Sequence, residues 1–247
     1  MSESVAPESS YPPAPAPDNK NRPYPAGYWG GLKLGAGLDV SSLGIGGQLA
    51  LQVMDRANAR VGFDWINVRG TSSSGGIAYA GNVHLQSINA NFDYFLFRNV
   101  HVSPGLLIYN WNHASESAAI PGGQSFSFGN GAYESSTASP VTANGTVGLR
   151  RVAPELLVGM GNLVPRGLRR WDWEVEAGVA FQGAPKVALG LSGIVCAPPN
   201  ESGPTCTDAA TDPSVLSDAP IQEAKVSREL SIFRFYPVVA VGISYSF

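Results

Sequence analysis

The chain ends with the stretch Val239-Ala240-Val241-Gly242-Ile243-Ser244-Tyr245-Ser246-Phe247, in which large apolar residues alternate strictly with small or polar ones. Successive side chains of an extended chain point to opposite faces, so one face of this stretch is apolar and aromatic. The other face carries only alanine, glycine and serine. The pattern predicts a β-strand that lies between an apolar phase and a tightly packed interior.

Seven further stretches show similar alternation and predict strands that precede the last one. They lie near residues 29–40, 45–53, 60–65, 83–96, 100–111, 146–160 and 171–181, and the final strand begins near Phe235. The connections near 55–58, 97–99 and 163–169 are short, whereas those at 70–82, 112–144 and 184–230 are long and polar. Short periplasmic turns and long outer loops are typical of transmembrane β-barrels. The expected fold class is therefore all-β, an eight-stranded antiparallel up-and-down transmembrane β-barrel over residues 27–247.

Three features depart from regular alternation. Pro104 interrupts the fifth predicted strand and indicates a bulge or an edge-like distortion. The sixth predicted strand changes parity near Arg150-Arg151. Within the last long connection, residues from about Pro220 to Leu230 have a helical pattern, for which Asp218 is the expected N-cap.

The composition favours a membrane barrel over a soluble one. Charged residues make up 14 % of the chain, well below the roughly 25 % of soluble domains, and no apolar run approaches the roughly 18 residues of a membrane helix. A soluble lipocalin-like barrel has the same two-residue period with an apolar interior, and it is the main structural alternative. The low charge, the terminal phenylalanine and the aromatic residues at strand ends favour the membrane barrel. Those aromatic residues are Trp29, Tyr94, Trp111, Trp171, Trp173, Tyr245 and Phe247.

Two segments are expected to lie outside the barrel wall. Residues 1–26 are rich in proline, serine and alanine and show no apolar period, so we expect a disordered leader. Cys196 and Cys206 are the only cysteines and share one polar segment without a histidine. This arrangement predicts a loop disulfide in an oxidising compartment, with two free thiols as the alternative, and it argues against a metal site.

If the apolar faces meet lipid, the opposite faces place a set of charged residues in the lumen. The set is Lys33, Asp39, Arg60, Asp64, Asp93, Glu155, Asp172, Glu174 and Glu176, with Arg151 as an addition. Acidic residues outnumber basic ones, and eight strands enclose a space just wide enough for side chains. One interpretation is a sealed core of ion pairs. The other is a narrow, cation-preferring path in which the carboxylates attract positive solutes.

Other function classes have weaker support. The net charge of -3 gives no basic surface for nucleic acid. His84 and His113 are expected at the rim or in loops and His101 near the periplasmic end, and none lies beside a recognisable nucleophile. No glycine loop of the phosphate-binding type opens a helix. We therefore expect no enzyme, cofactor or metal, while an anchor or adhesion protein that acts through its outer loops remains an alternative.

Several segments resemble a known family. The ending Gly242-x-x-Tyr245-x-Phe247 resembles the terminal signal that barrel proteins present to their assembly machinery, although Ala240 replaces the usual polar residue. Segments 43–47, 181–187 and 234–239 look like those of small OmpA/OmpW-type barrels, in particular the CarO-like group of eight-stranded outer-membrane proteins. Members of that group have been linked to passive uptake of small, often basic, amino acids. The resemblance implies a monomer in the bacterial outer membrane, in contact with lipid and lipopolysaccharide, with a channel role for small cationic or amino-acid solutes.

Overall fold

The computed structural model describes residues 33–108, 111–165, 169–197 and 205–247. The predicted leader over residues 1–26 and Trp29 lie outside the described residues. The described chain is dominated by β-strands, with one α-helix and one short 3-10 helix, which confirms the all-β prediction. No helix in the described part of the chain is long and apolar enough to cross a membrane.

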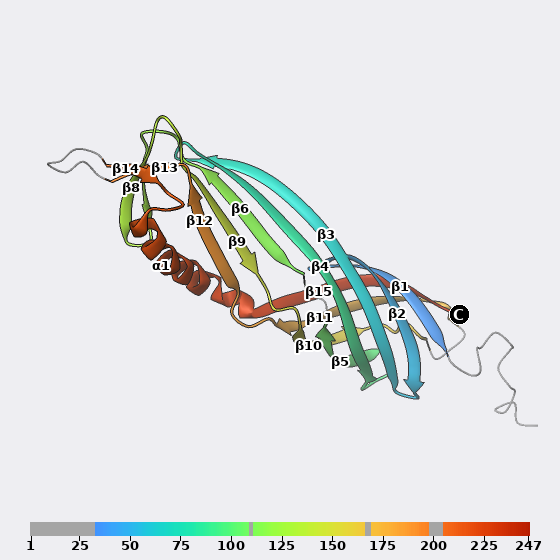
Figure 1. Cartoon of the computed structure of the whole chain (residues 1–247). Helices are drawn as coiled ribbons and strands as arrows, with labels where there is room; N and C mark the ends of the chain where they lie inside the picture. Colours follow the sequence, from blue (N-terminus) through green and yellow to red (C-terminus); the bar gives the residue numbers. More distant parts are fainter. Residues whose placement is uncertain (1–32, 109–110, 166–168, 198–204) are drawn as a thin grey trace, which may run out of the picture.

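Eight strands form a closed ring in which every neighbouring pair is antiparallel (Figure 1). Around the ring the order is β4-β3-β2-β1-β15-β11-β10-β5, and the pairing of β5 with β4 closes it. The strands are β1 (Leu34–Ser41), β2 (Gly44–Met54), β3 (Ala57–Ser74), β4 (Ile77–Phe95), β5 (Val100–Leu107), β10 (Ala153–Met160), β11 (Trp171–Phe181) and β15 (Phe235–Ser246). Closure leaves these eight strands without a free edge inside the ring.

The outer surface of the ring is apolar. In β15 the large residues Val239, Val241 and Ile243 are exposed, whereas Ala240, Ser244 and Ser246 on the opposite face are buried. The same division holds around the ring, where the exposed residues include Leu38, Val40, Ile45, Leu49, Val61, Phe63, Phe92, Leu156, Val158 and Val175. A surface of this kind is unfavourable in water and favourable in lipid.

Aromatic residues gather at both ends of the ring. We call the end that carries the β2–β3, β4–β5 and β10–β11 connections the turn end, and the opposite end the extended end. At the turn end the ring centroids of Trp171 and Tyr245 are 5.0 Å apart, and those of Tyr245 and Phe247 are 5.3 Å apart. At the extended end the ring centroids of Phe181 and Phe235 are 5.9 Å apart. Two such girdles mark the interfaces of transmembrane barrels.

Beyond the ring, β3 and β4 continue into a second body that we call the extension (Figure 1). There β6 (His113–Ala119), β9 (Thr142–Gly148) and β12 (Lys186–Ser192) extend the sheet from β4. A four-stranded sheet adds β7 (Ser125–Phe128), β8 (Gly131–Ser135), β13 (Ile194–Cys196) and β14 (Cys206–Asp208). Helix α1 (Pro213–Glu229) and the short helix η2 (Leu230–Arg234) lead back to β15.

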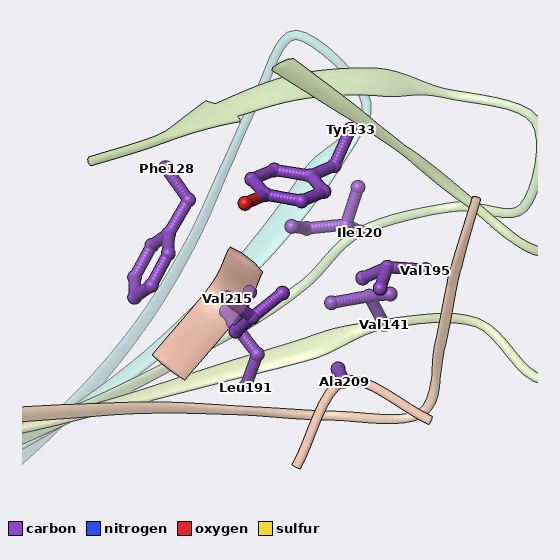
Figure 2. Packing of buried hydrophobic residues seen from close by; sticks show 8 residues of the cluster. All are labelled: Ile120, Phe128, Tyr133, Val141, Leu191, Val195, Ala209 and Val215. Carbon is purple, nitrogen blue, oxygen red and sulfur yellow. The ribbon is translucent and has the colours of Figure 1, made fainter. Parts of the chain in front are cut away.

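The extension has its own hydrophobic core, shown in Figure 2. The core comprises Ile120, Phe128, Tyr133, Val141, Leu191, Val195, Ala209 and Val215. Helix α1 also protects the outermost strand, because the Glu223 carboxylate accepts a 2.9 Å hydrogen bond from the Leu189 amide on β12. A free strand edge would otherwise be open to pairing with other chains.

The long polar connections predicted at residues 70–82, 112–144 and 184–230 are not loops throughout, because they contain strands and a helix. Residues 70–82 form a hairpin, because Gly75 and Gly76 adopt φ angles of 57° and 83° that permit a two-residue turn. Segments 112–144 and 184–230 contain strands and the helix. The sixth predicted strand is also two strands, β9 and β10, which end and begin on either side of Arg150-Arg151. Arg151 is exposed and does not lie in the ring interior.

The predicted helix exists, but its N-cap is wrong. Helix α1 starts seven residues earlier than expected, at Pro213, and Asp212 caps it by accepting hydrogen bonds from the amides of Ser214 and Val215. Pro220 lies inside the helix rather than at its start. The predicted disulfide is confirmed, because the sulfur atoms of Cys196 and Cys206 are 2.03 Å apart between β13 and β14.

Candidate functional site

The inward face of the ring places carboxylates beside glycines. Across β11, β15, β1, β2 and β3, the register joins Glu174 to Gly242, Asp39, Gly46 and Asp64 in one row. A Cβ atom at Gly46 would lie 2.8 Å from Asp64 Oδ1 and 2.9 Å from Asp39 Oδ1. Glycine is therefore required there, since a larger residue would occupy the space into which both carboxylates turn.

Arg60 crosses the interior and binds three carboxylates. Its NH2 group lies 3.1 Å from Asp93 Oδ1 and 2.6 Å from Glu176 Oε1. Its NH1 group donates to Glu174 at 3.2 Å and to the second oxygen of Glu176 at 2.7 Å. All four side chains are at most 5 % exposed. The guanidinium thus makes a two-pronged bond to Glu176, a geometry for which arginine is suited.

His101 completes this cluster, which we call the Arg60 cluster. Its Nε2 atom lies 2.9 Å from Glu176 Oε1, and the side chain is 1 % exposed. His101 is the second residue of β5 and lies near the turn end of the ring, and its side chain is buried in the interior, where the sequence analysis assigned it no role. Nearby, the Ser103 hydroxyl donates a 2.7 Å hydrogen bond to Asp93.

Three members of the Arg60 cluster have the donor atoms of a metal site. Ligand atoms of Asp93, His101 and Glu176 all lie within 4.8 Å of one another. The Arg60 guanidinium, however, contacts both Asp93 and Glu176 and already supplies a positive charge between them. The geometry therefore favours an ion-pair cluster at this position.

A small cavity of about 20 Å³ lies against the Arg60 cluster, because Arg60 and Glu176 form part of its lining. The carboxylates Asp39, Asp64 and Glu155 also line it, together with the apolar residues Leu43, Leu157, Val238 and Ala240. Asp64 accepts hydrogen bonds from Ser41 at 2.8 Å and from Asn89 at 3.2 Å. The cavity is wide enough for one occupant the size of a water molecule.

Apolar clusters lie in the ring on both sides of the Arg60 cluster. At the turn end, the β10–β11 connection turns inward and buries Leu163 and Val164 against Ala50. Asn162 fixes this turn, because its side-chain oxygen accepts hydrogen bonds from Asn58 and from the Val164 amide, each 2.9 Å long. At the extended end a second apolar cluster fills the ring, formed by Leu43, Leu107, Ala153, Leu157, Ala180 and Val238.

The structure brings most of the predicted lumen residues together. Six carboxylates and Arg60 are buried in the interior, and the carboxylates are Asp39, Asp64, Asp93, Glu155, Glu174 and Glu176. Asp172 shares their face of β11 but is half-buried, and Lys33 precedes β1 and is half-buried. The predicted assembly signal lies in β15 and at its end, where Gly242 and Tyr245 are half-buried and Phe247 is exposed.

Sequence reasoning missed His101, Ser103 and Asn162 as interior residues. The signal for the first two was present, because the apolar residue Val102 lies between them in the fifth predicted strand, and an outward Val102 requires both neighbours to point inward. No signal marked Asn162, which lies in an inward-folded turn. His84 and His113 are cross-strand neighbours on β4 and β6, with ring centroids 5.1 Å apart.

The extension holds a separate buried carboxylate. Asp218 accepts hydrogen bonds from the Tyr133 hydroxyl at 2.7 Å and from the Asn130 amide at 3.0 Å. The hydrogen bond from Tyr133, together with those from the backbone amides of Asn130 and Gly131, holds the pKa of Asp218 below its usual range. Burial and the neighbouring carboxylate raise the pKa of Tyr133. Asp218 therefore joins α1 to the β7–β8 hairpin as a charged acceptor.

Comparison with known proteins gives one kind of match. Neither a protein-family model nor a curated protein sequence matches the chain. The crystal structure of Acinetobacter baumannii CarO aligns over 86% of this chain and 97% of its own, with a TM-score of 0.52 and 20% identity. The chain has the CarO fold. Acinetobacter baumannii CarO2 covers 87% of this chain and 98% of its own, with a TM-score of 0.56 and 18% identity. At these identities the likeness to CarO concerns the fold alone.

Proposed function

We propose that the chain is a bacterial outer-membrane β-barrel whose closed ring spans the bilayer. The apolar outer surface, the two aromatic girdles and the CarO fold support this location. The ring strands β2, β11 and β15 have 11, 11 and 12 residues, and a tilted membrane strand needs about 9–11. The turn end would then face the periplasm and the extension the exterior.

Within this proposal, the barrel is a sealed anchor for the extension. The main observation in support is the Arg60 cluster. Its ion pairs join β3 to β11 across the interior, and the side chains that form them are at most 5 % exposed. Apolar clusters lie on either side of the Arg60 cluster and fill much of the remaining space. A barrel filled in this way transmits no solute, so function lies in the extension, where a folded core presents surface to partners outside the cell.

A second candidate function is a narrow passive path for cations or small basic solutes. It has one specific observation in its favour, the excess of six buried carboxylates over Arg60 and His101 in the described interior. Such an excess attracts positive charge. A path would require the Arg60 cluster and both apolar clusters to separate.

Conductance distinguishes the two candidates. Purified protein is reconstituted into planar bilayers, and a general porin in the same membranes serves as the positive control. The sealed anchor should give no single-channel steps in salts of small or large cations. Reproducible steps, with a reversal potential that indicates cation preference under a salt gradient, would refute the sealed anchor and establish the path.

The remaining contacts of the protein follow from this placement. Lipid and the lipid part of lipopolysaccharide would cover the exposed apolar residues of the ring. The assembly machinery would bind β15 through Gly242, Tyr245 and Phe247, the last of which is 65 % exposed. Because the ring closes within one chain, a monomer suffices for insertion.

A further inference from the structure

The outer face of the sheet changes from apolar to polar where the ring ends. On this face of β3 the last large apolar residue is Trp65, which is also the last β3 residue that pairs with β2. Trp65 pairs with Gln86 on β4, whose carbonyl oxygen accepts a 3.0 Å hydrogen bond from the Trp111 amide. Tryptophan is enriched at membrane–water interfaces, so this level marks the boundary of the lipid in the proposed outer-membrane location.

Beyond this level the same face carries cations, amides and hydroxyls. Side chains alternate between the two faces of a sheet, so the outer face continues through every second residue of β3, β4, β6, β9 and β12. The first row beyond Trp65 contains Asn67, His84, His113, Gly148 and Lys186. The next two rows contain Arg69, Asn82, Ser115, Thr146 and Ala188, then Thr71, Ala80, Ser117, Asn144 and Gly190. We call these three rows the outer face of the extension, and no aspartate or glutamate occurs in them.

The cations of the outer face are not neutralised by the protein. In the described part of the chain, no ion pair joins Arg69 or Lys186 to a carboxylate, and both residues are exposed. Arg150 and Arg151 follow β9 and are also exposed, which adds two cations at the membrane end of that strand. The whole chain has 19 acidic residues against 16 lysines and arginines, so this basic character is local.

An open hollow of about 520 Å³ lies on the outer face of the extension. Side chains of the second and third rows form its walls, and its floor is the intervening row, made of Gly70, Gly81, Glu116 and Gly145. Glu116 alternates with Ser115 and Ser117, so its side chain points to the opposite face, where it borders a second hollow beside the extension core. The first hollow is within the size of small-ligand sites, about 300–1,000 Å³.

We propose that the outer face of the extension binds the phosphorylated saccharide headgroup of lipopolysaccharide. The inference rests on the proposed outer-membrane location. There the headgroup follows directly on the acyl chains, just as the outer face follows directly on the lipid-facing wall of the ring. A strand rise of about 3.3 Å per residue puts Arg69 about 13 Å along β3 from Trp65, within reach of the headgroup.

The chemistry of the face fits this ligand in two ways. Arg69 and Lys186 supply positive charge for phosphate groups, for which guanidinium and ammonium groups are suited. The amides and hydroxyls that line the hollow both donate and accept hydrogen bonds, as the hydroxyls of a sugar require. The extension is thereby fixed against the membrane surface by its side as well as by the ring.

The test uses the full chain in nanodiscs of phosphatidylcholine, a lipid without net charge. The probe is deep-rough lipopolysaccharide from which all acyl chains have been removed, so that only the headgroup can bind. Isothermal titration calorimetry measures the Kd. We expect wild-type protein to bind the probe, and to bind it more weakly as the salt concentration is raised, since added ions screen the charges. A dephosphorylated probe should bind no more tightly than the intact probe binds the charge-deficient variant described next.

That variant is Arg69→Gln with Lys186→Gln, and each single change is measured as well. A basic residue near an anionic lipid surface contributes roughly a factor of five to the affinity, so the double variant should weaken binding about thirtyfold. Arg69→Lys keeps the charge and should retain most of the affinity. The matched control is Arg56→Gln with Arg98→Gln, which removes the same charge from exposed positions in the turns at the other end of the ring and should leave binding unchanged. Circular dichroism verifies that each variant is folded.

Three outcomes would overturn the site. The first is that folded wild-type protein does not bind the probe at millimolar concentration. The second is that the control variant loses as much affinity as the double variant, which would show unspecific attraction. The third is that polyglutamate binds as tightly and with the same dependence on Arg69 and Lys186, which would assign the face to an acidic protein partner.

Failure of this site differs from failure of the proposed function. Fractionation of the cells that produce the chain reports its location independently of the probe. Recovery of the chain outside the outer membrane would refute the proposed function, and the inference with it. Recovery in the outer membrane without binding of the probe would overturn the headgroup site alone.

Discussion

Replacing Arg60 by methionine should destabilise the folded barrel strongly. The change keeps much of the side-chain volume but removes the cation that binds Asp93, Glu174 and Glu176 at 2.6–3.2 Å. Breaking a buried ion pair by removing one partner typically costs about 3–5 kcal/mol, because it leaves uncompensated buried charge. Here three carboxylates lose one shared partner, so we expect the cost to reach this range, which is roughly a hundredfold or more in the folding equilibrium.

The assay is reversible urea unfolding in lipid vesicles, followed by tryptophan fluorescence. Arg69→Met is the matched control, since Arg69 lies on the same strand but is exposed in the extension, and its change should stay within about 0.5 kcal/mol. Adding Glu176→Gln to the Arg60 variant should recover part of the loss, because one of the unpaired charges disappears.

A small effect would refute the reasoning. If Arg60→Met unfolds within about 1 kcal/mol of wild type, the carboxylates must be solvated, as surface ion pairs are. The interior would then hold water rather than a packed cluster. That result would also favour the cation path over the sealed anchor.

Three further predictions concern other parts of the molecule. Ile243→Arg, on the lipid face of β15, should destabilise the ring by urea unfolding in vesicles, but by less than the about 2–4 kcal/mol expected at the bilayer midplane, because Tyr245 of the turn-end girdle is two residues away; Ser244→Asn on the inward face should be milder. Reducing Cys196–Cys206, verified by intact mass after alkylation, should leave the unfolding of the ring unchanged, because the bond lies in the extension. Hydrogen exchange of the α1 amides should depend on the ionisation of Asp218. Because the pKa of Asp218 is lowered in the folded protein, its stabilising contribution is complete above about pH 4 and is lost as the pH falls through that lowered pKa. Asp218→Asn should flatten this pH dependence. An unchanged acid profile in Asp218→Asn would contradict this assignment.

The strands of the ring were predictable because their environment differs on the two faces. An outward residue meets an apolar surface and an inward one meets a crowded interior, so β11 and β15 carry strict alternation that the sequence displays. The inward position of Glu174 and Glu176 could be predicted from the outward position of their apolar neighbours Trp173 and Val175.

The extension was not predictable from the same signal. The strand β6 reads His-Ala-Ser-Glu-Ser-Ala-Ala and β9 reads Thr-Ala-Asn-Gly-Thr-Val-Gly, and both are small and polar on both faces. Their strand conformation depends on pairing with β4 and with each other, which is a tertiary effect. The start of helix α1 was predicted too late. Pro220 looked like the first residue of the helix, whereas the N-cap is Asp212 and Pro220 lies inside the helix.

The interior of the ring depends on glycine as much as on charge. Eight strands leave little room, and a long side chain such as Arg60 can cross only where facing residues are small. Gly159 is one such position, because a Cβ atom there would lie 2.4 Å from His101 Nε2. The glycine that admits His101 also lets it approach Glu176, and Gly46 admits Asp39 and Asp64 in the same way. Small residues in this interior therefore make the space that the polar side chains then occupy.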